Sequence, residues 1–340
     1  MTEGGWATGQ GRSWPPWESS TPTGAWVQNA LTSPSGGATV HPEMRFILIF
    51  GRPTTGRVAL AAVACLGLAG CRAGPSTNDA RPTVVASFYP PYEAAVQVGG
   101  RLVEAENLTP AGAEPHDLEL SPTQVDLVLD ADVLLYAGGG FQPAVEQLAT
   151  RREGITVDIL EAAEPGATGD PHVWLDPLRM ERIVGTTAEG LSRADPAEAG
   201  TYRRNARRYS DDIHQLHLRF EEELADCKER TFVTSHRAFS YLAARYGLRE
   251  ESLSGPSPEA EPDPARLEEL RPVVERTGVV FAEPLLPPAA VETLARETGA
   301  RVEFLDPLEG LTEEDLARGA TYVSVMERNL SVLREALDCR

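Results

Sequence analysis

Basic residues are scarce in this 340-residue chain. It carries 31 lysines and arginines against 51 aspartates and glutamates, which gives a formal net charge of −20 at pH 7. A protein that binds a phosphate backbone needs a basic face, and one that adheres by charge to an anionic lipid surface needs basic clusters. The composition therefore predicts no nucleic-acid partner and no charge-driven docking on a membrane.

The chain also contains few cysteines, few histidines and no long apolar run. Four cysteines are too few for a small disulfide-built fold, and only six histidines occur, so their positions are informative. The apolar run over residues 58–68 would span about 16 Å as a helix, which is too short for a membrane core of ~30 Å. The chain length allows about two domains, and the 41% share of hydrophobic residues allows buried cores.

The first 81 residues are not expected to belong to the fold. Residues 1–43 are rich in Gly, Ser, Thr and Pro without apolar periodicity, which predicts a disordered or misassigned extension. Met44 then begins a basic stretch, followed by the apolar run and by small residues. This order is typical of a secretory signal, here over residues 44–70.

The signal ends in Leu68-Ala69-Gly70-Cys71, which resembles the lipobox of bacterial lipoprotein signal peptides. The resemblance implies that Cys71 is acylated and that residues 71–81 form a tether. It also implies an exported protein, anchored by lipid to the outer face of the cell membrane. The alternative is an ordinary signal peptide with an incidental cysteine.

Two cysteines, Cys227 and Cys339, remain in the body of the chain once the signal is removed. An even pair in an exported protein predicts a disulfide. The alternative is a pair of free or metal-binding thiols.

Residues 82–340 alternate short apolar strands with helices, which predicts an α/β fold of mainly parallel sheets flanked by helices. One lobe is expected over residues 82–195 and a second over residues 228–340. The predicted strands lie at 83–88, 102–108, 132–136 and 155–159 in the first lobe and at 231–235, 248–253, 279–282 and 301–305 in the second. A single final helix is expected over residues 313–337.

A long helical pattern over residues 196–227 separates the two lobes. Apolar residues recur at steps of three and four from Tyr202 to Leu224 and mark one stripe. Such a helix would be ~40 Å long. We therefore expect two α/β lobes joined by one long backbone helix.

Three histidines stand where predicted strands end or loops begin. They are His116, His172 and His236, and a carboxylate, Asp306, closes the last short strand. Ligands of open α/β sheets bind at the carboxyl ends of the strands, so these four side chains are candidates for one site. Their spacing matches no local zinc motif, and it does not by itself bring them together.

Eight stretches occur in order across residues 83–337, among them EPHDLELSP, DPHVWLDP and SHRAFSYLAARYGL. They resemble the cluster A-I solute-binding lipoproteins of metal ABC transporters, the ZnuA/TroA-like group. The resemblance implies two lobes bridged by a rigid helix and metal binding by His116, His172, His236 and Asp306. It also implies a binding protein that captures a divalent metal outside the membrane and delivers it to a membrane permease.

The donor set indicates which metal is carried. Three imidazoles and one carboxylate suit tetrahedral Zn²⁺, which is expected as the transported ligand. Mn²⁺ is the less favoured alternative, because manganese members of the family carry a carboxylate where His236 stands. Glu114 and Glu283 are alternative carboxylate donors if Asp306 points away.

Two segments depart from the pattern of the family. The loop over residues 161–170 is short and has no histidine, whereas many zinc members carry a long histidine-rich loop there. Residues 138–143 lack the acidic-aromatic pair that is usual after the preceding strand. The first departure weakens the assignment of zinc, and the second has no consequence that the sequence reveals.

Other classes of function fit less well. A zinc hydrolase needs an open coordination position and a general base, and the sequence shows no HExxH, nucleophile elbow or Ser/His/Asp set. We therefore expect no enzyme. An adhesin role, proposed for some members of the family, stays open as a second role. The chain is expected to be a monomer.

Overall fold

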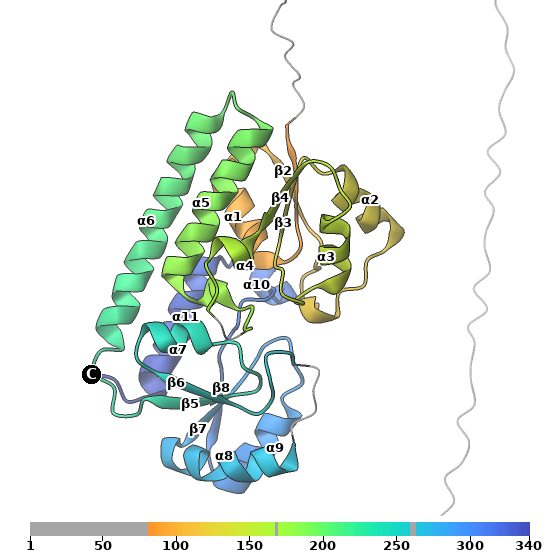
Figure 1. The fold of residues 1–340 in the computed structure, drawn as a ribbon. Helices are drawn as coiled ribbons and strands as arrows, with labels where there is room; N and C mark the ends of the chain where they lie inside the picture. Colours follow the sequence, from red (N-terminus) through yellow and green to blue (C-terminus); the bar gives the residue numbers. More distant parts are fainter. Residues whose placement is uncertain (1–80, 167–168, 259–262) are drawn as a thin grey trace, which may run out of the picture. The chain divides into compact units, whose positions relative to one another are not determined.

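The computed structural model describes residues 81–166, 169–258 and 263–340, which fall within one compact unit (Figure 1). The predicted extension, the signal peptide, the lipidation of Cys71 and nearly all of the tether lie outside the described residues. They stay predictions. Among the helices of the described part, none has both the length and the apolar character that crossing a membrane requires.

The first sheet has four parallel strands in the order β2-β1-β3-β4. Their bounds are β1 Thr83–Ala86, β2 Glu104–Asn107, β3 Val133–Tyr136 and β4 Ile155–Asp158. Successive residues of the central strands enter different cores, with Val84 and Val133 on one face and Val85 and Leu134 on the other. Apolar runs without polar alternation are what a sheet covered on both faces needs.

The second sheet repeats this plan in the order β6-β5-β7-β8, again with all strands parallel. Its strands are β5 Thr231–Thr234, β6 Arg249–Ser252, β7 Val279–Ala282 and β8 Arg301–Phe304. Val233 and Val280 face a small core that also holds residues of α8 (Pro264–Thr277) and α9 (Ala289–Thr298). Phe232 and Phe281 face the large core that extends into the first lobe.

The remaining helices of the described residues flank the two sheets (Figure 1). They are α1 Tyr89–Gly99, α2 Pro122–Asp130, α3 Pro143–Ala149, α4 Ile159–Ala162, α5 Pro177–Ala194 and α7 Ser240–Arg245, with short 3₁₀ turns at Gly100–Leu102, Pro115–Asp117 and Val173–Leu175. Ser121 caps α2 in a capping box with Gln124, and Pro122 occupies its first turn. Serine, proline and glutamine at these positions satisfy the free N–H groups at the helix start.

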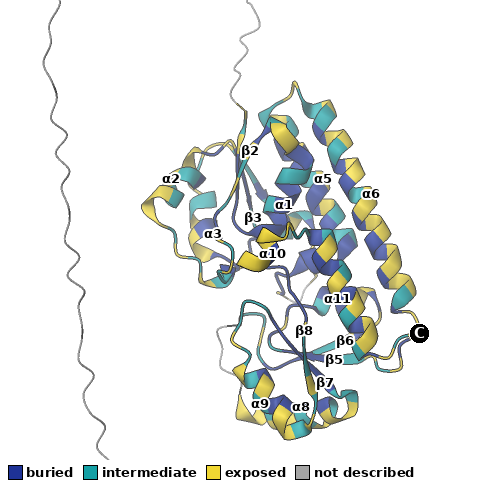
Figure 2. Cartoon of the chain, turned by 180° about the vertical axis from the view of Figure 1, so that it is seen from behind, coloured by how far each residue is buried: buried dark blue, intermediate teal, exposed yellow. Residues whose placement is uncertain are grey.

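The long helix α6 spans Ala199–Glu223, a little less than predicted. The members of its predicted apolar stripe are all buried, and α6 packs against α5, α1 and α11. Figure 2 shows its outer face exposed along much of the length. The 25 residues span about 38 Å, so α6 runs from the first lobe to the connection that enters β5 (Figure 1).

The final helix is two helices, and the prediction of a single one over residues 313–337 is wrong. The structure has α10 over Glu313–Ala317 and α11 over Tyr322–Ala336. Gly319 between them has a φ of 70°, a left-handed conformation that ends a helix. Thr321 then caps α11 through the backbone N–H of Ser324. Gly319 and the capping residue Thr321 are both local signals, so the break between the two helices could have been predicted from the sequence.

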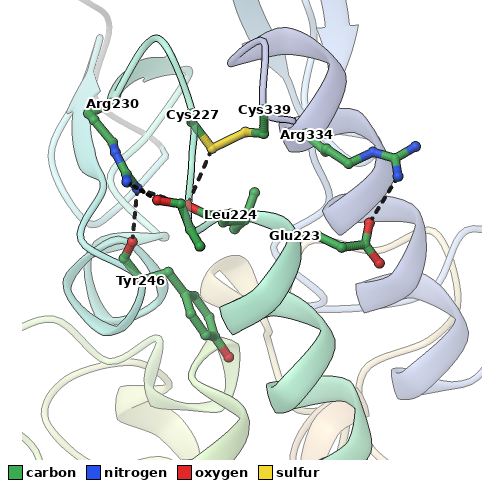
Figure 3. Close-up of a disulfide and its surroundings, with 8 residues drawn as sticks. Glu223, Leu224, Cys227, Arg230, Tyr246, Arg334 and Cys339 are labelled. Carbon is green, nitrogen blue, oxygen red and sulfur yellow. Dashed lines mark hydrogen bonds and ion pairs between the residues drawn. A yellow bond between two sulfur atoms is a disulfide. The ribbon is translucent and has the colours of Figure 1, made fainter.

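A disulfide joins Cys227, just after α6, to Cys339, just after α11 (Figure 3). The cysteines are separated by 112 residues in the sequence. Backbone hydrogen bonds from Glu229 N to Leu337 O (3.1 Å) and from Arg340 N to Asp226 O (3.0 Å) accompany the bridge. The ends of two long helices are thereby held together.

The strand order decides where a ligand can lie. In each sheet the chain moves outward in one direction from the first strand and then crosses to the other side, so the order reverses between β1 and β3 and between β5 and β7. A crevice forms at the carboxyl ends of strands at such a point. Ser235 and His236 follow β5, and Glu283 follows β7.

Candidate metal site

Four side chains from distant parts of the sequence meet in one cluster: His116, His172, His236 and Glu309. One donor atom from each lies within 4.8 Å of the donor atoms of the other three. His116 lies in the 3₁₀ turn after β2, and His172 caps the 3₁₀ turn before α5. His236 follows β5, and Glu309 follows β8. Both lobes therefore contribute donors.

The Glu309 carboxylate is the common neighbour of the three imidazoles. Its Oε1 lies 2.7 Å from Nε2 of His172, 3.2 Å from Nε2 of His236 and 3.4 Å from Nε2 of His116. The Nε2 atoms of His172 and His236 are 3.3 Å apart. All three rings thus present the same nitrogen to one small volume.

The cluster is nearly sealed from solvent. His172 and His236 are 0% exposed and Glu309 is 1% exposed. The side chain of His116 is 7% exposed, which makes it the most accessible of the four. Its Nε2 is buried and makes no hydrogen bond to any described residue. A buried ring nitrogen without a partner is costly, and a bound cation would satisfy it.

Carboxylates behind two of the histidines orient their rings. Asp170 Oδ1 lies 2.7 Å from Nδ1 of His172, and Glu283 Oε2 lies 2.6 Å from Nδ1 of His236. A proton held on Nδ1 of His172 by the Asp170 hydrogen bond leaves Nε2 free to donate its electron pair to a metal. The contact of Glu283 with Nδ1 of His236 is a close ion pair without hydrogen-bond geometry. Glu283, one of the alternative donors, therefore supports a ligand and is not part of the four-residue cluster.

The loop that carries His116 is held from the segment over residues 138–143. Gln142 Nε2 donates to the carbonyl oxygen of Pro115 at 3.1 Å, and the Phe141 ring lies 4.4 Å from the His116 ring. Glu114, the other alternative donor, accepts a hydrogen bond from the backbone N–H of His116 at 3.2 Å. The segment without the acidic-aromatic pair thus supplies contacts that place His116.

The charged groups of the cluster shift the pKa values of their neighbours. Burial alone would raise the pKa of Glu309, but the three imidazoles beside it hold the pKa well below its usual range. Burial acts to lower the pKa values of His172 and His236, yet the facing carboxylates outweigh it and raise both. Burial, with the charge of Glu309, raises the pKa of Glu114 to about 8. Without a metal, the carboxylates that face His172 and His236 thus favour the protonated form of these two imidazoles.

Asp306, predicted as the carboxylate donor, lies outside the four-residue cluster, and the carboxylate within the cluster is that of Glu309. Its Oδ1 accepts a hydrogen bond from the backbone N–H of Leu308 at 2.8 Å, and its Oδ2 lies 3.7 Å from Nη2 of Arg328. Burial raises the pKa of Asp306 to about 7. The Asp306 carboxylate thus closes a turn on its own backbone, and Glu309 follows that turn. The sequence shows an acidic residue at both positions, so residue type alone does not separate them.

The arrangement offers three nitrogen donors and one oxygen donor in a volume that is nearly sealed from solvent. This set and number match the closed, four-coordinate sites that proteins build for Zn²⁺. Carboxylates behind the histidines are a further feature of such sites.

The sequence has clear relatives among proteins of known function. The family described as ZnuA, zinc-uptake complex component A periplasmic, matches residues 84–336. The zinc-binding lipoprotein AdcA of Streptococcus pneumoniae strain R6 is 35% identical over 302 residues, covering 82% of this chain and 60% of that protein. The chain thus matches about 60% of the length of that relative.

Solved structures agree with the sequence comparison. The crystal structure of the Zn(II)-bound ZnuA-like domain of Streptococcus pneumoniae AdcA has a TM-score of 0.67 at 36% identity, covering 76% of this chain and all of that one. The laminin-binding protein Lmb of Streptococcus agalactiae, described as bifunctional with adhesin and metal transporting activity, has a TM-score of 0.67 at 31% identity and covers the same shares. These matches confirm the predicted two-lobe α/β fold, and the chain belongs to the ZnuA family of periplasmic zinc-uptake components.

Proposed function

We propose that this protein captures Zn²⁺ outside the cell membrane and delivers it to the permease of an ABC transporter. The observation that carries the proposal is the convergence of His116, His172, His236 and Glu309 on one buried volume. The matching relatives support it, since AdcA is named a zinc-binding lipoprotein and its ZnuA-like domain binds Zn(II). The transported ion is the cargo of the protein.

The donor set favours zinc over manganese. Three of the four donors are imidazoles, and the position that distinguishes manganese members of the family is occupied by His236. Imidazole is a good ligand for zinc, whereas manganese prefers oxygen donors. The intrinsic affinity order of divalent metals also places zinc above manganese at a site of this kind.

Four protein donors support binding rather than catalysis. A catalytic zinc keeps one coordination position for water or substrate, whereas in the proposed site Glu309 would take the fourth position. The family is one of solute-binding transport components, and we propose the same for this chain. Lipid anchorage at Cys71, the permease partner and the monomeric state are parts of the proposal. An adhesin role stays a prediction.

The test is zinc titration of the metal-free mature chain, residues 72–340, in competition with a chromophoric chelator. His116→Ala, His172→Ala, His236→Ala and Glu309→Gln should each weaken zinc binding at least about 100-fold, because changes even behind a ligand cost about 10–100-fold. His214→Ala is the matched control, because His214 is half exposed on α6 and lies outside the cluster.

Two results would overturn the proposal. Wild-type zinc affinity in all four cluster variants would remove the site. Tighter binding of manganese than of zinc, measured by direct competition, would overturn the assignment of the metal. Delivery is tested in cells that lack the gene, where the wild-type chain but not His172→Ala should restore growth under zinc limitation.

A further inference from the structure

The turn that carries Glu309 has a strained backbone. Leu308, directly before Glu309, has a φ of 56°. Residues with a β-carbon rarely adopt this left-handed conformation, and a leucine has no side-chain hydrogen bond that would favour it. Leu308 is also fully buried. A conformation of this kind persists only where the surrounding structure imposes it.

Asp306 holds the turn from one side. Its Oδ1 accepts the Leu308 N–H at 2.8 Å. Asp306 is itself fixed by Asn329 of α11, which accepts the Asp306 N–H at 3.0 Å and donates to the Asp306 carbonyl oxygen at 2.7 Å. Two hydrogen bonds therefore tie the start of the turn to the helix α11, and a third closes the turn itself.

Trp174 holds the turn from the other side. Its indole Nε1 donates to the carbonyl oxygen of Pro307 at 2.8 Å, and the side chain is fully buried. Trp174 lies two residues after His172, and its ring is 5.2 Å from the His172 ring. Beyond Glu309, the carbonyl oxygen of Leu311 accepts the N–H of Gly112 at 2.8 Å. The indole thus links the segment of one metal ligand to the turn of another.

We propose that Trp174 and Asp306 are positioning residues of the metal site. Together they keep Leu308 in its left-handed conformation, which directs the Glu309 carboxylate back among the three imidazoles. If the hydrogen bond of either Asp306 or Trp174 to the turn is lost, the backbone of Leu308 relaxes toward negative φ. The Glu309 carboxylate then moves away from the three imidazoles. The inference rests on the proposed function, because it concerns the affinity of the same zinc site.

The first experiment compares Asp306→Ala with Asp306→Asn in the zinc titration. Alanine cannot accept the Leu308 N–H, and zinc affinity should fall about 10-fold, the lower end of the effect of residues behind a ligand. Asparagine keeps an oxygen at the same place without a charge, and should keep the affinity within about threefold of the wild type. Equal losses in the two variants would show that the charge of Asp306 matters and would overturn its positioning role.

The second experiment replaces the indole by Trp174→Phe, which keeps an aromatic ring and removes the N–H. Zinc affinity should fall about 10-fold in the wild-type background. In a Glu309→Gln background the same change should cost less than about threefold, because its effect passes through Glu309. The visible spectrum of the Co²⁺-loaded Trp174→Phe variant should lose part of its tetrahedral intensity.

Tyr202→Phe is the control variant for Trp174→Phe. Tyr202→Phe removes another fully buried donor, whose hydroxyl bonds Asp195 at 3.1 Å, and should leave zinc affinity unchanged. The positioning role of the indole would be overturned if Trp174→Phe weakened zinc binding equally in the wild-type and Glu309→Gln backgrounds. It would also be overturned if the change left zinc binding in the wild-type background unaffected. If circular dichroism shows that Trp174→Phe does not fold, the Asp306 pair decides. Failure of the proposed function is distinct, because Glu309→Gln itself would then bind zinc normally.

Discussion

Removal of the Cys227–Cys339 disulfide should destabilise the protein strongly without changing its affinity for zinc. The perturbation is the double variant Cys227→Ser/Cys339→Ser, which leaves no thiol in the body of the chain to bind metal. The bridge closes a loop across 112 residues of sequence. A cross-link of that span restricts the unfolded chain far more than it restricts the folded one.

The expected magnitude follows from the loop length. The chain-entropy relation for a loop of 112 residues gives about 5 kcal/mol at 25 °C. The unfolding free energies of domains are typically about 5–15 kcal/mol, so this loss is a large part of the total. For a chain of this size it corresponds to a decrease in Tm of about 10–20 °C.

The folded state should keep its geometry when the bridge is absent. Figure 3 shows Arg334 paired with Glu223 at 3.2 Å and Arg230 donating to the Leu224 carbonyl oxygen at 2.9 Å, both beside the bridge. These contacts and the neighbouring backbone hydrogen bonds do not involve sulfur. The four side chains of the candidate metal site lie on other segments of the chain. The change should therefore act on the unfolded state.

The assay is equilibrium unfolding in urea, followed by circular dichroism, with zinc titration of the same preparations. The wild-type chain unfolded in the presence of a reductant is the control, and it should match the double serine variant. A loss below about 1 kcal/mol would refute the loop-entropy reasoning. A loss of zinc affinity in the folded variant would refute the separation of the bridge from the site.

Further predictions concern the site and two glycines. Glu309→Gln should weaken zinc binding at least about 100-fold in the chelator competition, and binding at wild-type strength would contradict its role as a donor. Zinc affinity should fall as the pH is lowered below 7, because protons held on the imidazoles at raised pKa must leave before the metal binds. The expected loss of zinc affinity is about 10-fold per pH unit for each proton displaced. His236→Ala should reduce the slope of affinity against pH by one proton. A zinc affinity independent of pH between 5.5 and 7.5 would refute this coupling to protonation. Gly138→Ala should lower the free energy of unfolding by about 1–2 kcal/mol, because its Cβ would lie 2.3 Å from Oδ2 of Asp158, the residue that caps α4. Gly185 lies inside α5 with open space around it, so Gly185→Ala should instead raise the free energy of unfolding by up to about 1 kcal/mol in the same urea assay. If Gly185→Ala destabilised the protein more than Gly138→Ala, the reasoning would be contradicted.

Local patterns in the sequence predicted most elements because their causes are local. The strands of both sheets lie inside the predicted ranges. Successive apolar residues mark the central strands β1, β3, β5 and β7, which are covered on both faces. Ser121 and Pro122 predict the start of α2, and the stripe from Tyr202 predicts the buried face of α6. The break between α10 and α11 was missed although Gly319 signals it, because the apolar pattern continues across the break.

Motif and order along the chain also indicated three of the four side chains of the candidate metal site. The segments around His116, His172 and His236 resemble one family, and each histidine follows a strand or begins a loop. In parallel sheets such positions collect at one edge, so their convergence follows from the topology once the strand order is given.

The fourth member of the cluster, Glu309, was shown only by the tertiary structure. Asp306 and Glu309 are three residues apart, and both are acidic and follow β8. Which of them reaches the imidazoles depends on the conformation of Leu308 between them, and that conformation is held by Asn329 through Asp306 and by Trp174 through Pro307. Trp174 lies 133 residues earlier in the chain than Pro307. A turn held by contacts so remote cannot be inferred from its own residues, because the energy that selects its backbone conformation comes from outside the turn.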